Sequence, residues 1–549
     1  MSKNKLLVLS LVLVLLVAGF ISKDSDIYFE ISKSIDLFGK VYKEVTLNYV
    51  DDVNPQEFMI AGLKGMLSSL DPYTVYIDAD MKKDIDLITT GKYGGIGAGV
   101  GIRSEKVTIV DLLEGFSAHR QGIRIGDVIE EVNGNRITKD NYNELRNYLK
   151  GKPGEVVTLK IKREGTDDNI VFDLVLEEIV VKNLTYYGFI PENSENVYLK
   201  LSGFTRSAGE EIKDALLELN SQKEIKSIVL DLRGNPGGLL DQAIDVAEKF
   251  LERKQLIVSV IGKDKDKVTK YFSNEEPVAG NSKLVLLVDN GSASASEIVA
   301  GAIQDHDRGI IIGETSFGKG LVQTLLPLSY NTSLKITTAR YYTPSGRCIQ
   351  KVNYSSKNKV IEDEQENEEN NFQTDNLRPV FGSGGINPDT TISNDSESSQ
   401  LKFLRARGMF FKFATYFYNS NQDLVLNSLK DSTYFNTFMA YLNEYEFYYL
   451  SKSEKLLDEI KINCEKENYG KEVHSCINSL AEKLTTAKKN ELKKYKHEVV
   501  ARIKMELAAR IHGRNGRINE SLKNDNQFFT ALQILNNEDA YSQMLLLKL

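Results

Sequence analysis

Cysteine is scarce in this chain of 549 residues, which contains only Cys348, Cys464 and Cys476. The count is odd and no pair has C-x-x-C spacing, so the sequence indicates neither a disulfide framework nor a zinc site. A bridge between Cys464 and Cys476 stays open for an oxidising compartment. Histidine is also rare, and none of the five lies in a zinc-peptidase His/Glu pair. We therefore expect a protein without a metal or another cofactor.

An excess of positive charge is also lacking. The formal net charge is −8 at pH 7, which argues against a nucleic-acid partner, because nucleic-acid binders carry a basic face. The composition is that of an ordinary globular protein, and the chain is too long for a single hydrophobic core. Several domains are therefore expected, and an oligomer stays open.

The N-terminus has the pattern of an export signal. Lys3 and Lys5 precede an apolar or small run from Leu6 to Ile21, which is the order of a secretory signal. The run is slightly short for a spanning helix and lacks a clear cleavage site. Residues 1–22 are thus a cleaved signal peptide or an uncleaved anchor formed by residues 6–21. In both cases we expect an exported protein, in the periplasm or on the outer face of the cytoplasmic membrane.

Hydrophobic spacing divides the rest of the chain into four regions. Residues 23–85 carry apolar residues at helical spacing, and residues 86–180 are glycine-dense and alternate like strands. In residues 181–395, short apolar strands lead through glycine-rich turns into helical patterns. Residues 396–549 are helical and rich in aromatic residues, which we expect in a core. An acidic stretch, residues 355–376, is expected to be a solvated loop.

Repetition of strand, turn and helix implies βαβ units and a mostly parallel sheet. The predicted fold is therefore multidomain α+β. It has an α/β core at 181–395, an inserted β-rich domain at 86–180, an N-terminal helical segment at 23–85 and a C-terminal helical domain of unknown role. Ligands of such a core bind at the carboxyl ends of its strands.

The candidate chemistry lies in a serine cluster and a following lysine. Gly291–Glu297 reads Gly-Ser-Ala-Ser-Ala-Ser-Glu at an expected helix start, and Lys319 and Gln323 follow on one face of a strand-like run. Serine becomes nucleophilic only when a base takes its proton, and lysine can do this only when burial lowers its pKa. An ordinary helix-capping serine and a surface lysine are the alternatives.

Two further observations bear on whether the serine cluster and Lys319 are catalytic or structural. Asp231–Gly238 places a glycine pair at a strand end, where free amides suit an oxyanion or a phosphate. It matches no nucleotide-binding fingerprint, and a plain turn is the alternative. His306 lies in the helix after the serine cluster, roughly three turns from its start, so it is a poor base for a Ser-His-Asp triad.

These residues, in this order, resemble the carboxyl-terminal processing (tail-specific) serine peptidases. The resemblance runs from about Ser68 to Ile392, and its motifs are specific in combination. They are Ser69–Tyr73, Tyr93–Gly97, Gly122–Ile129, Gly151–Gly154, Asp231–Gly238, Gly291–Glu297, Phe317–Gly320 with Gln323, Tyr341–Arg347 and Gly385–Asp389. Gly234 and the sequence Ser117-Ala118-His119 depart from the usual family pattern. Neither departure removes a group that the chemistry needs.

The resemblance implies a ClpP/crotonase-like core that carries a Ser/Lys dyad. The family nucleophile corresponds to Ser294, in preference to Ser292 and Ser296, and its base corresponds to Lys319. The family glutamine corresponds to Gln323. The oxyanion amides implied are those of Ala295 and Gly237, with Gly237 preferred over Gly238.

The β-rich module corresponds to the family's PDZ domain. Its loop residues Gly94, Gly95, Ile96 and Gly97 are implied to bind a substrate's C-terminal carboxylate while the peptide adds as a strand. The implied function is an endopeptidase that cleaves proteins near their C-termini, with protein or peptide substrates as partners. A binding protein without chemistry and a hydrolase of small esters are the rivals. Whether the PDZ domain gates the active site stays open.

Overall fold

The computed structural model describes residues 24–78, 91–352, 354, 372–382, 384–393, 398–421, 425–426, 428–445 and 449–546. The chain divides into two compact units. The smaller comprises Met1–Ala79, Gln323–Thr337 and Asn353–Gln365, and the larger comprises Asp80–Val322, Thr338–Val352 and Glu366–Leu549. The apolar run 6–21 and most of the acidic stretch 355–376 lie outside the described residues. Of the helices that are described, none is long and apolar enough to cross a membrane.

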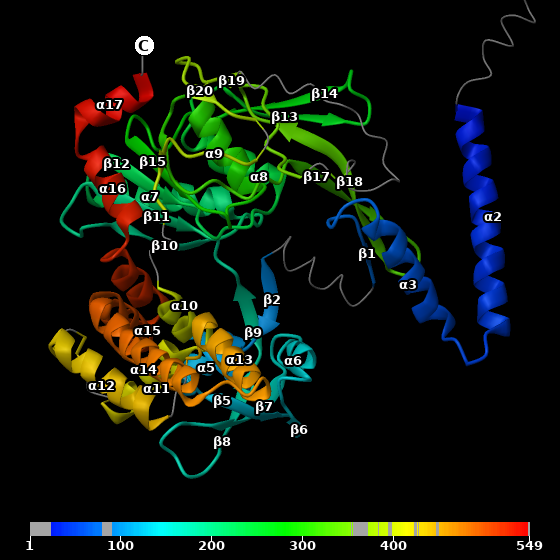
Figure 1. Cartoon of the computed structure of the whole chain (residues 1–549). Helices are drawn as coiled ribbons and strands as arrows, with labels where there is room; N and C mark the ends of the chain where they lie inside the picture. The colour runs from blue at the N-terminus through cyan, green and yellow to red at the C-terminus, as the bar shows by residue number, and fades with distance from the viewer. Residues whose placement is uncertain are drawn as a thin grey trace, which may run out of the picture. The chain divides into compact units, whose positions relative to one another are not determined.

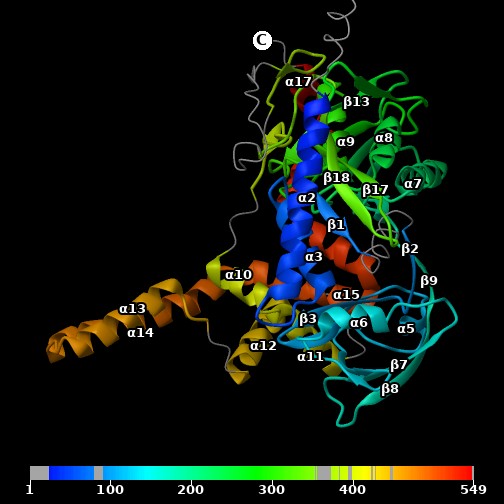
Figure 2. The same cartoon turned by 90° about the vertical axis from the view of Figure 1, so that its right-hand side faces the viewer.

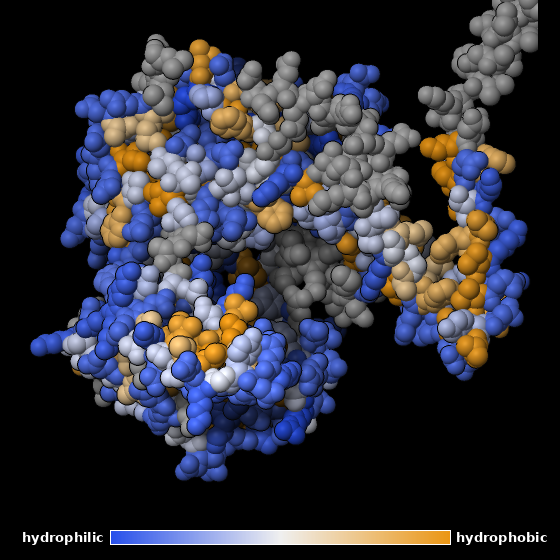
Figure 3. Space-filling model, viewed as in Figure 1, coloured by the Kyte–Doolittle hydropathy of each residue, from blue (hydrophilic) through white to orange (hydrophobic). Residues whose placement is uncertain are grey.

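Within its described residues, the smaller unit contains two helices and a short strand ladder. Helix α2 (Asp24–Asn48) precedes α3 (Pro55–Ser68), which Asn54 caps by accepting the N–H of Gln56 at 3.0 Å. Strand β1 (Val75–Ile77) pairs antiparallel with the start of β18 (Ser333–Tyr342), and β17 (Leu321–Pro327) also pairs with β18. Helix α2 carries exposed apolar side chains, orange in Figure 3, among them Ile27, Phe29, Ile31, Ile35 and Phe38.

The larger unit is built around a six-stranded sheet of order β10-β11-β12-β15-β16-β21. The strands are β10 (Leu184–Phe189), β11 (Asn196–Leu201), β12 (Ser227–Asp231), β15 (Lys283–Val288), β16 (Ile310–Gly313) and β21 (Thr390–Thr391). From β11 to β21 the neighbours run parallel, and β10 is antiparallel to β11. This confirms the predicted α/β core within a multidomain α+β fold.

Helices cover both faces of this sheet because its buried strands alternate their side chains between two cores. Helices α7 (Ala208–Gln222), α8 (Leu240–Glu248) and α9 (Ala295–Asp305) pack on the face that includes Ile228 and Leu230. Helices α16 (Asn526–Leu535) and α17 (Glu538–Leu546) pack on the opposite face, which includes Val229. Figure 1 shows α16 and α17 in red beside β12 and β15. Helices α16 and α17 therefore complete the hydrophobic core around this sheet.

Shorter strands lie beside this core. Strand β13 (Leu256–Gly262) pairs antiparallel with β14 (Val268–Phe272) and with the end of β18, where Ser259 lies opposite Tyr342. Strands β19 (Phe372–Gln373) and β20 (Pro379–Val380) form a two-stranded ladder.

The β-rich module is a separate sheet with its own hydrophobic core. The sheet order is β3-β4-β5-β7-β8, with β6 paired to β5. The strands are β3 (Ala98–Arg103), β4 (Lys106–Leu112), β5 (Val128–Val132), β6 (Asn135–Arg136), β7 (Val156–Lys162) and β8 (Ile170–Val175). Helices α5 (Ser117–Arg120) and α6 (Tyr142–Tyr148) accompany it, and β2 (Lys92–Gly95) pairs with β9 (Glu177–Val180). Strand β3 forms one edge of the sheet.

The remaining helices form an aromatic-rich core. They are α10 (Ser399–Ala406), α11 (Met409–Ser420), α12 (Asp431–Glu444), α13 (Lys452–Lys466), α14 (Lys471–Lys494) and α15 (Lys496–Leu522). Phe410, Phe413 and Phe417 are buried in it, as predicted for these aromatic residues. Figure 2 shows α13 and α14 side by side. Helix α15 is kinked at His512 and Gly513, whose backbone angles are not helical.

Candidate active site

Ser294 occupies a strained turn between a buried strand and a helix. Strand β15 ends at Val288, and α9 begins at Ala295 directly after Ser294. The backbone of Ser294 has φ 56° and ψ −112°, whereas an ordinary N-cap serine has extended angles. Such a conformation costs on the order of 1–3 kcal/mol and persists only when its surroundings impose it. Similar sharp strand-to-helix turns hold the nucleophile of other serine hydrolases.

The three serines of the cluster differ in what their hydroxyls do. Ser292 is fully buried and its Oγ donates to the carbonyl of Leu232 at 2.8 Å. Ser296 is fully buried and its Oγ donates to the carbonyl of Asn235 at 2.9 Å. Ser294 is half-buried. The two flanking hydroxyls are thus fixed in structural hydrogen bonds, whereas the side chain of Ser294 is partly exposed.

A buried carboxylate joins the backbones of Ser294 and Lys319. Oε2 of Glu297 accepts the N–H of Ser294 at 2.8 Å and the N–H of Lys319 at 2.9 Å. Oε1 of the same side chain accepts the Ser316 hydroxyl at 2.5 Å and the N–H of Gly318 at 2.7 Å. Glu297 is 0 % exposed. Burial raises the pKa of the Glu297 carboxyl, although the four donors oppose that shift.

The Tyr341 hydroxyl makes a second connection between the same two residues. It donates toward the carbonyl oxygen of Ser294 at 3.2 Å and toward that of Lys319. Tyr341 is 2 % exposed, and Lys319 is half-buried. Residues that lie 25 positions apart in the sequence are therefore held together at both their N–H and C=O groups. We call Glu297 and Tyr341 the backbone clamp.

The glycine-rich turn after β12 packs directly against Ser294. At Gly237, where φ is 94°, an added Cβ would lie 2.9 Å from Cβ of Ser294 and 2.6 Å from the carbonyl oxygen of Ala293. Only glycine fits this approach. The Gly237 N–H donates to Oδ1 of the buried Asn235 at 2.9 Å. An oxyanion would have to replace Asn235 as the partner of the Gly237 N–H. The N–H of Ala295 belongs to the first turn of α9, and an N–H in that position has no partner within the helix.

Gln323 lies on β17 in the smaller unit, whereas Ser294 and Lys319 belong to the larger one. The Gln323 amide donates to Oγ1 of Thr337 at 3.4 Å. Thr337 also contacts Oγ1 of Thr74, which Asp71 binds. Gln323 is therefore part of a chain of polar side chains in its own unit.

His306 is occupied by structural contacts. It caps the C-terminus of α9, with Nδ1 at 2.7 Å from Asp375 and Nε2 at 2.7 Å from the Leu256 carbonyl. Both ring nitrogens are engaged, which agrees with its predicted unsuitability as a base. Over the ranges that the structure describes, no group of His, Cys, Asp and Glu has the arrangement of a metal site.

The predicted carboxylate-binding loop leads into the edge strand of the β-rich module. Gly94 and Gly95 lie on β2, opposite Glu178 and Glu177 of β9, whereas Ile96 is buried in the module's core. Gly97, with φ 77°, precedes β3. Helix α6 approaches β3, because the Tyr142 hydroxyl donates to the Val100 carbonyl at 2.9 Å.

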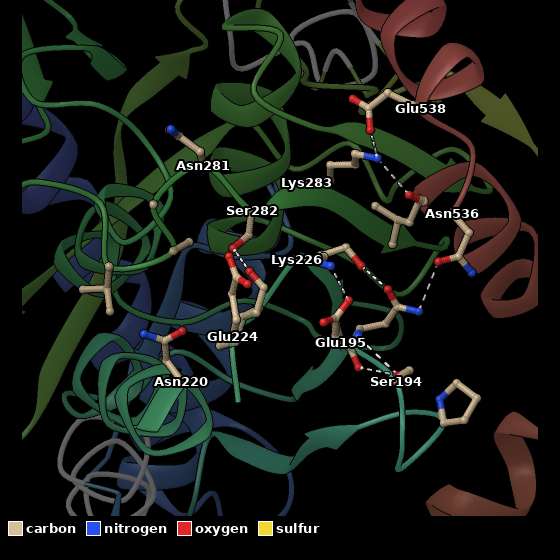
Figure 4. Close-up of a pocket in the computed structure, with 18 residues that line it drawn as sticks. Ser194, Glu195, Asn220, Glu224, Lys226, Asn281, Ser282, Lys283, Asn536 and Glu538 are labelled. Carbon is tan, nitrogen blue, oxygen red and sulfur yellow. Dashed lines mark hydrogen bonds and ion pairs between the residues drawn. The ribbon is translucent and has the colours of Figure 1, made fainter. Parts of the chain in front are cut away.

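A cavity also lies at the amino end of the core sheet, opposite the end that carries Ser294. It measures about 1040 Å³ and is lined at the amino ends of β11, β12 and β15, by Asn196, Ser227 and Lys283 (Figure 4). Among its charged side chains, Lys226 pairs with Glu195 at 2.7 Å and Lys283 pairs with Glu538. Substrates of parallel sheets bind at the carboxyl ends, where Ser294 and Gly237 lie, so this cavity is not the candidate site.

An ion-pair network that the sequence did not indicate supports the glycine-rich turn after β12. Asp231 binds Arg233 at 2.6 Å, and Arg233 also binds Asp525 just before α16 at 2.7 Å. Burial raises the pKa of the Asp231 carboxyl, but the charges of Lys200 and Arg233 outweigh it and hold that pKa below its ordinary value. Nothing in the sequence pairs Arg233 with a residue 292 positions later, so no signal pointed to this contact.

A strained serine beside a lysine and a glycine-rich turn, with a second β-rich domain, defines the class of PDZ-bearing serine hydrolases. Comparison with protein families agrees. Residues 196–359 match peptidase family S41, residues 108–163 match the PDZ domain, and residues 401–535 match the C-terminal helical domain of probable PDZ-proteases.

Individual relatives give the same result. The chain is 38% identical over 321 residues to the carboxy-terminal-processing protease of Bartonella bacilliformis, spanning 58% of this chain and 73% of that one. It is 32% identical over 323 residues to the carboxy-terminal processing protease CtpB of Bacillus subtilis, spanning 59% and 67%. The solved photosystem II D1 C-terminal processing protease aligns at 23% identity with a TM-score of 0.36, over 70% of this chain and 96% of that one. The two curated relatives, with the match to the family model, show that the chain belongs to peptidase family S41 and is a serine peptidase.

Proposed function

We propose that this peptidase cleaves proteins near their C-termini with a dyad of Ser294 and Lys319. The observation that carries the proposal is the backbone clamp. One carboxylate oxygen of Glu297 binds the N–H groups of both residues, and the Tyr341 hydroxyl contacts both carbonyls. Proton transfer from serine to a base requires this kind of fixed proximity.

The chemistry follows the usual course of acyl transfer. Neutral Lys319 accepts the proton of the Ser294 hydroxyl while Oγ attacks the scissile carbonyl carbon. The N–H groups of Ala295 and Gly237 stabilise the oxyanion. The tetrahedral intermediate collapses, the peptide C–N bond breaks, and the lysine ammonium returns its proton to the leaving amine. Water then hydrolyses the acyl-enzyme with Lys319 again as base. Gln323 is proposed to orient the lysine amine.

Covalent labelling tests the nucleophile directly. Treatment of the full chain with a fluorophosphonate should modify Ser294, and peptide mapping by mass spectrometry should locate the adduct there. Lys319→Ala should abolish labelling, because the serine loses its base. Modification of Ser292 or Ser296, or undiminished labelling of the Lys319→Ala variant, would contradict the dyad.

The PDZ domain is proposed to bind the substrate's C-terminal tail. Strand β3 is an edge strand, and such an edge accepts an added peptide strand. The peptide would lie between β3 and α6, with its carboxylate at Gly94–Gly97. In that position it competes with Tyr142, whose hydroxyl now holds the Val100 carbonyl.

Removing the Tyr142 hydroxyl should strengthen binding of the substrate's C-terminal tail. In the Tyr142→Phe variant the Val100 carbonyl is released, and an affinity gain of about 2- to 10-fold is expected from one hydrogen bond. Fluorescence anisotropy with a labelled peptide that ends in apolar residues measures it, on protein that also carries Ser294→Ala. Tyr148→Phe on the same helix serves as the control. Unchanged or weaker binding of Tyr142→Phe would show that peptides do not use this edge.

Export is proposed from the N-terminal pattern alone. Lys3, Lys5 and the run from Leu6 to Ile21 support a location outside the cytoplasm, in the periplasm or anchored to the membrane. N-terminal sequencing of the protein from membrane and soluble fractions distinguishes a cleaved signal from an anchor. A protein found uncleaved in the cytoplasm would refute the proposal.

A further inference from the structure

The glycine-rich turn that carries the Gly237 N–H has little rigidity of its own. Gly234 and Gly237 have φ 68° and 94°, a conformation that glycine adopts without strain. The direction of the Gly237 N–H therefore depends on the hydrogen bonds that hold the turn. Stabilisation of an oxyanion requires this N–H to be aimed before the reaction begins.

Side chains of aspartate and lysine fix the beginning of this turn at Arg233. The Arg233 N–H donates to Oδ1 of Asp231 at 2.9 Å, and the Arg233 carbonyl accepts Nζ of Lys200 at 2.8 Å. The N–H of the next residue, Gly234, donates to Oδ1 of Asp289 at 2.8 Å. Both peptide groups that flank Arg233 are therefore held by side chains from other parts of the core.

The guanidinium of Arg233 connects the same turn to the start of α16. Its Nε and Nη2 donate to the two carboxylate oxygens of Asp231, at 3.0 and 2.6 Å. Nη2 also lies 2.7 Å from Oδ2 of Asp525, and Nη1 donates to Oε1 of Gln527 at 2.9 Å. Gln527 is 0 % exposed, and its Nε2 donates to the Ile392 carbonyl at 2.7 Å. The arginine is thus bound from its own strand and from the helix at once.

This network fixes a position more effectively than it stabilises the fold. The side chains of Arg233 and Asp231 are 14% and 1% exposed. Taking both charges out of water costs about as much free energy as their attraction returns, so apolar residues of similar volume would stabilise the fold equally well. The planar guanidinium, by contrast, meets its acceptors on Asp231, Asp525 and Gln527 in a single orientation. The network therefore indicates that the turn has to be held in place.

We propose that Arg233 is a positioning residue for the oxyanion. It holds the glycine-rich turn so that the Gly237 N–H stays aimed at the substrate when this N–H exchanges Asn235 for the oxyanion. Asp525 and Gln527 hold the Arg233 side chain, so the C-terminal part of the chain contributes to catalysis through α16. The inference rests on the proposed function, in which the Gly237 N–H stabilises the oxyanion.

Arg233→Lys tests the proposal, because lysine keeps a positive charge beside Asp231 but cannot bind several acceptors in fixed directions. For hydrolysis of a protein with an apolar C-terminal tail, kcat should fall about 10- to 100-fold, less than when an oxyanion donor is removed outright. KM should change by less than about twofold, since the interaction is made only in the transition state. The measurement is made at a temperature where circular dichroism shows the variant to be folded. An unchanged kcat in the folded variant would overturn the proposal.

Arg378→Lys is the matched control. Arg378 is also bound by two carboxylates, those of Asp307 at 2.5 Å and Asp389 at 2.6 Å. It lies at the C-terminal end of α9, where its Nη2 donates to the Gln304 carbonyl at 3.2 Å. Arg378→Lys should lower stability but leave kcat within about twofold of the wild type. A loss of kcat as large as that of Arg233→Lys would mean that lost stability alone explains both variants, against the proposal.

Affinity for a peptide aldehyde distinguishes a positioning role from a purely structural one. Oγ of Ser294 adds to the aldehyde carbon, the C=O bond becomes a C–O single bond, and the serine proton passes to Lys319, so the new oxyanion faces the Gly237 N–H. Arg233→Lys should weaken this inhibitor by the same factor as kcat, about 10- to 100-fold. Binding of an uncleaved peptide of the same sequence, measured on protein that also carries Ser294→Ala, should not change. Equal aldehyde affinities of wild type and variant would refute the positioning role.

Asp525→Asn tests the part assigned to α16. Oδ1 of Asp525 accepts the Phe528 N–H at 3.0 Å while Oδ2 binds Arg233. Asparagine caps helices equally well, but its single oxygen cannot serve both partners. Both kcat and aldehyde affinity should fall about 3- to 10-fold, and a double variant with Arg233→Lys should be no slower than Arg233→Lys alone. Effects that multiply, or an unchanged Asp525→Asn variant, would overturn the role of α16. If Arg233→Lys does not fold, the aldehyde affinity of Asp525→Asn decides the proposal.

Failure of the proposed function would look different. If a fluorophosphonate does not label Ser294 in the wild type, or if Ser294→Ala retains hydrolysis, the nucleophile is wrong and Arg233 has no oxyanion to serve. If Ser294 is labelled and the wild type binds the aldehyde, while Arg233→Lys changes neither kcat nor aldehyde affinity, the nucleophile stands and only the role of Arg233 is lost.

Discussion

Replacing Ser294 by alanine should lower kcat by roughly 10⁴- to 10⁶-fold, because the loss of one residue of a serine peptidase's catalytic unit costs about that much. The loss should be confined to catalysis, since the half-buried hydroxyl contributes little to packing. The free energy of unfolding and the affinity for a tail peptide should stay near those of the wild type. Hydrolysis of a protein with an apolar C-terminal tail, followed by mass spectrometry of the products, is the measurement.

The neighbouring serines provide matched controls. Ser296→Ala removes a buried hydrogen bond, at a cost of about 1 kcal/mol of stability. Ser292→Ala removes the bond to the Leu232 carbonyl and also the acceptor of the Asp289 N–H, at a cost of about 2 kcal/mol. Their kcat/KM should stay within about tenfold of the wild type, because neither hydroxyl reaches the substrate. A loss as large as that of Ser294→Ala in either control would mean that the nucleophile has been misassigned.

Lys319→Ala should cause a loss of the same order as Ser294→Ala. Groups that act as one unit have non-additive effects, so the double variant should be no slower than the slower single variant. A double variant that loses the product of the two single effects would show that the residues act in separate steps. Retained hydrolysis by Lys319→Ala would exclude it as the base.

Much of this site was visible in the sequence because its signals are local. The buried strands before Gly291 and before Gly234 are short apolar runs, and each ends in glycine-rich residues that cannot continue a helix or a strand. The spacing from Ser294 to Lys319 then selected one serine from three by resemblance. The structure adds that Ser292 and Ser296 are fully buried, whereas Ser294 is half-buried. The α/β core followed from the order of strands and helices alone.

The sequence analysis did not predict the contacts that hold the candidate site together, of which one is local and the others are long-range. Glu297 stands three residues after Ser294, a spacing typical of a capping box, so its contact with the Ser294 N–H could have been predicted. Its contact with Lys319 depends on a chain reversal that no local pattern encodes. Tyr341, Asp525 and the α16–α17 cover of the sheet are likewise long-range contacts, which only the folded arrangement reveals.

Glu297 should be the most sensitive residue of the site that does not itself react. Glu297→Ala leaves the N–H groups of Ser294, Gly318 and Lys319 and the Ser316 hydroxyl without their acceptor in a buried place. Each buried donor left without an acceptor costs about 1–3 kcal/mol. We expect a loss of at least about 4 kcal/mol in the free energy of unfolding, the sum of the lower limits for the four donors, measured by urea titration. Peptidase activity should also be lost at temperatures where the variant is still folded.

The Glu297→Gln variant distinguishes the effect of the hydrogen bonds of Glu297 from the effect of its charge. In Glu297→Gln the amide oxygen can still accept the N–H groups of Ser294 and Lys319. The amide nitrogen can face the Ser316 hydroxyl, which is able to accept as well as donate. The Gly318 N–H then loses its acceptor, and the Ser316 hydroxyl, which already accepts the Ile386 N–H, must donate its proton elsewhere. Glu297→Gln should therefore recover most of the stability and a substantial part of kcat relative to Glu297→Ala, and an inactive but stable Glu297→Gln variant would assign the carboxylate a direct part in proton transfer.

The pH dependence of stability gives an independent check on Glu297. Burial raises the pKa of its carboxyl in the folded protein, above the ordinary value of about 4.3 that it has when unfolded. Folding then favours the protonated form, so the contribution is full below about pH 4.3 and is lost as pH rises through the folded pKa. The stability of the wild type, measured relative to the Glu297→Gln variant that cannot titrate there, should fall over this window. A relative stability that rises instead would mean that the four donors outweigh burial and that the ionised carboxylate is the form the fold prefers.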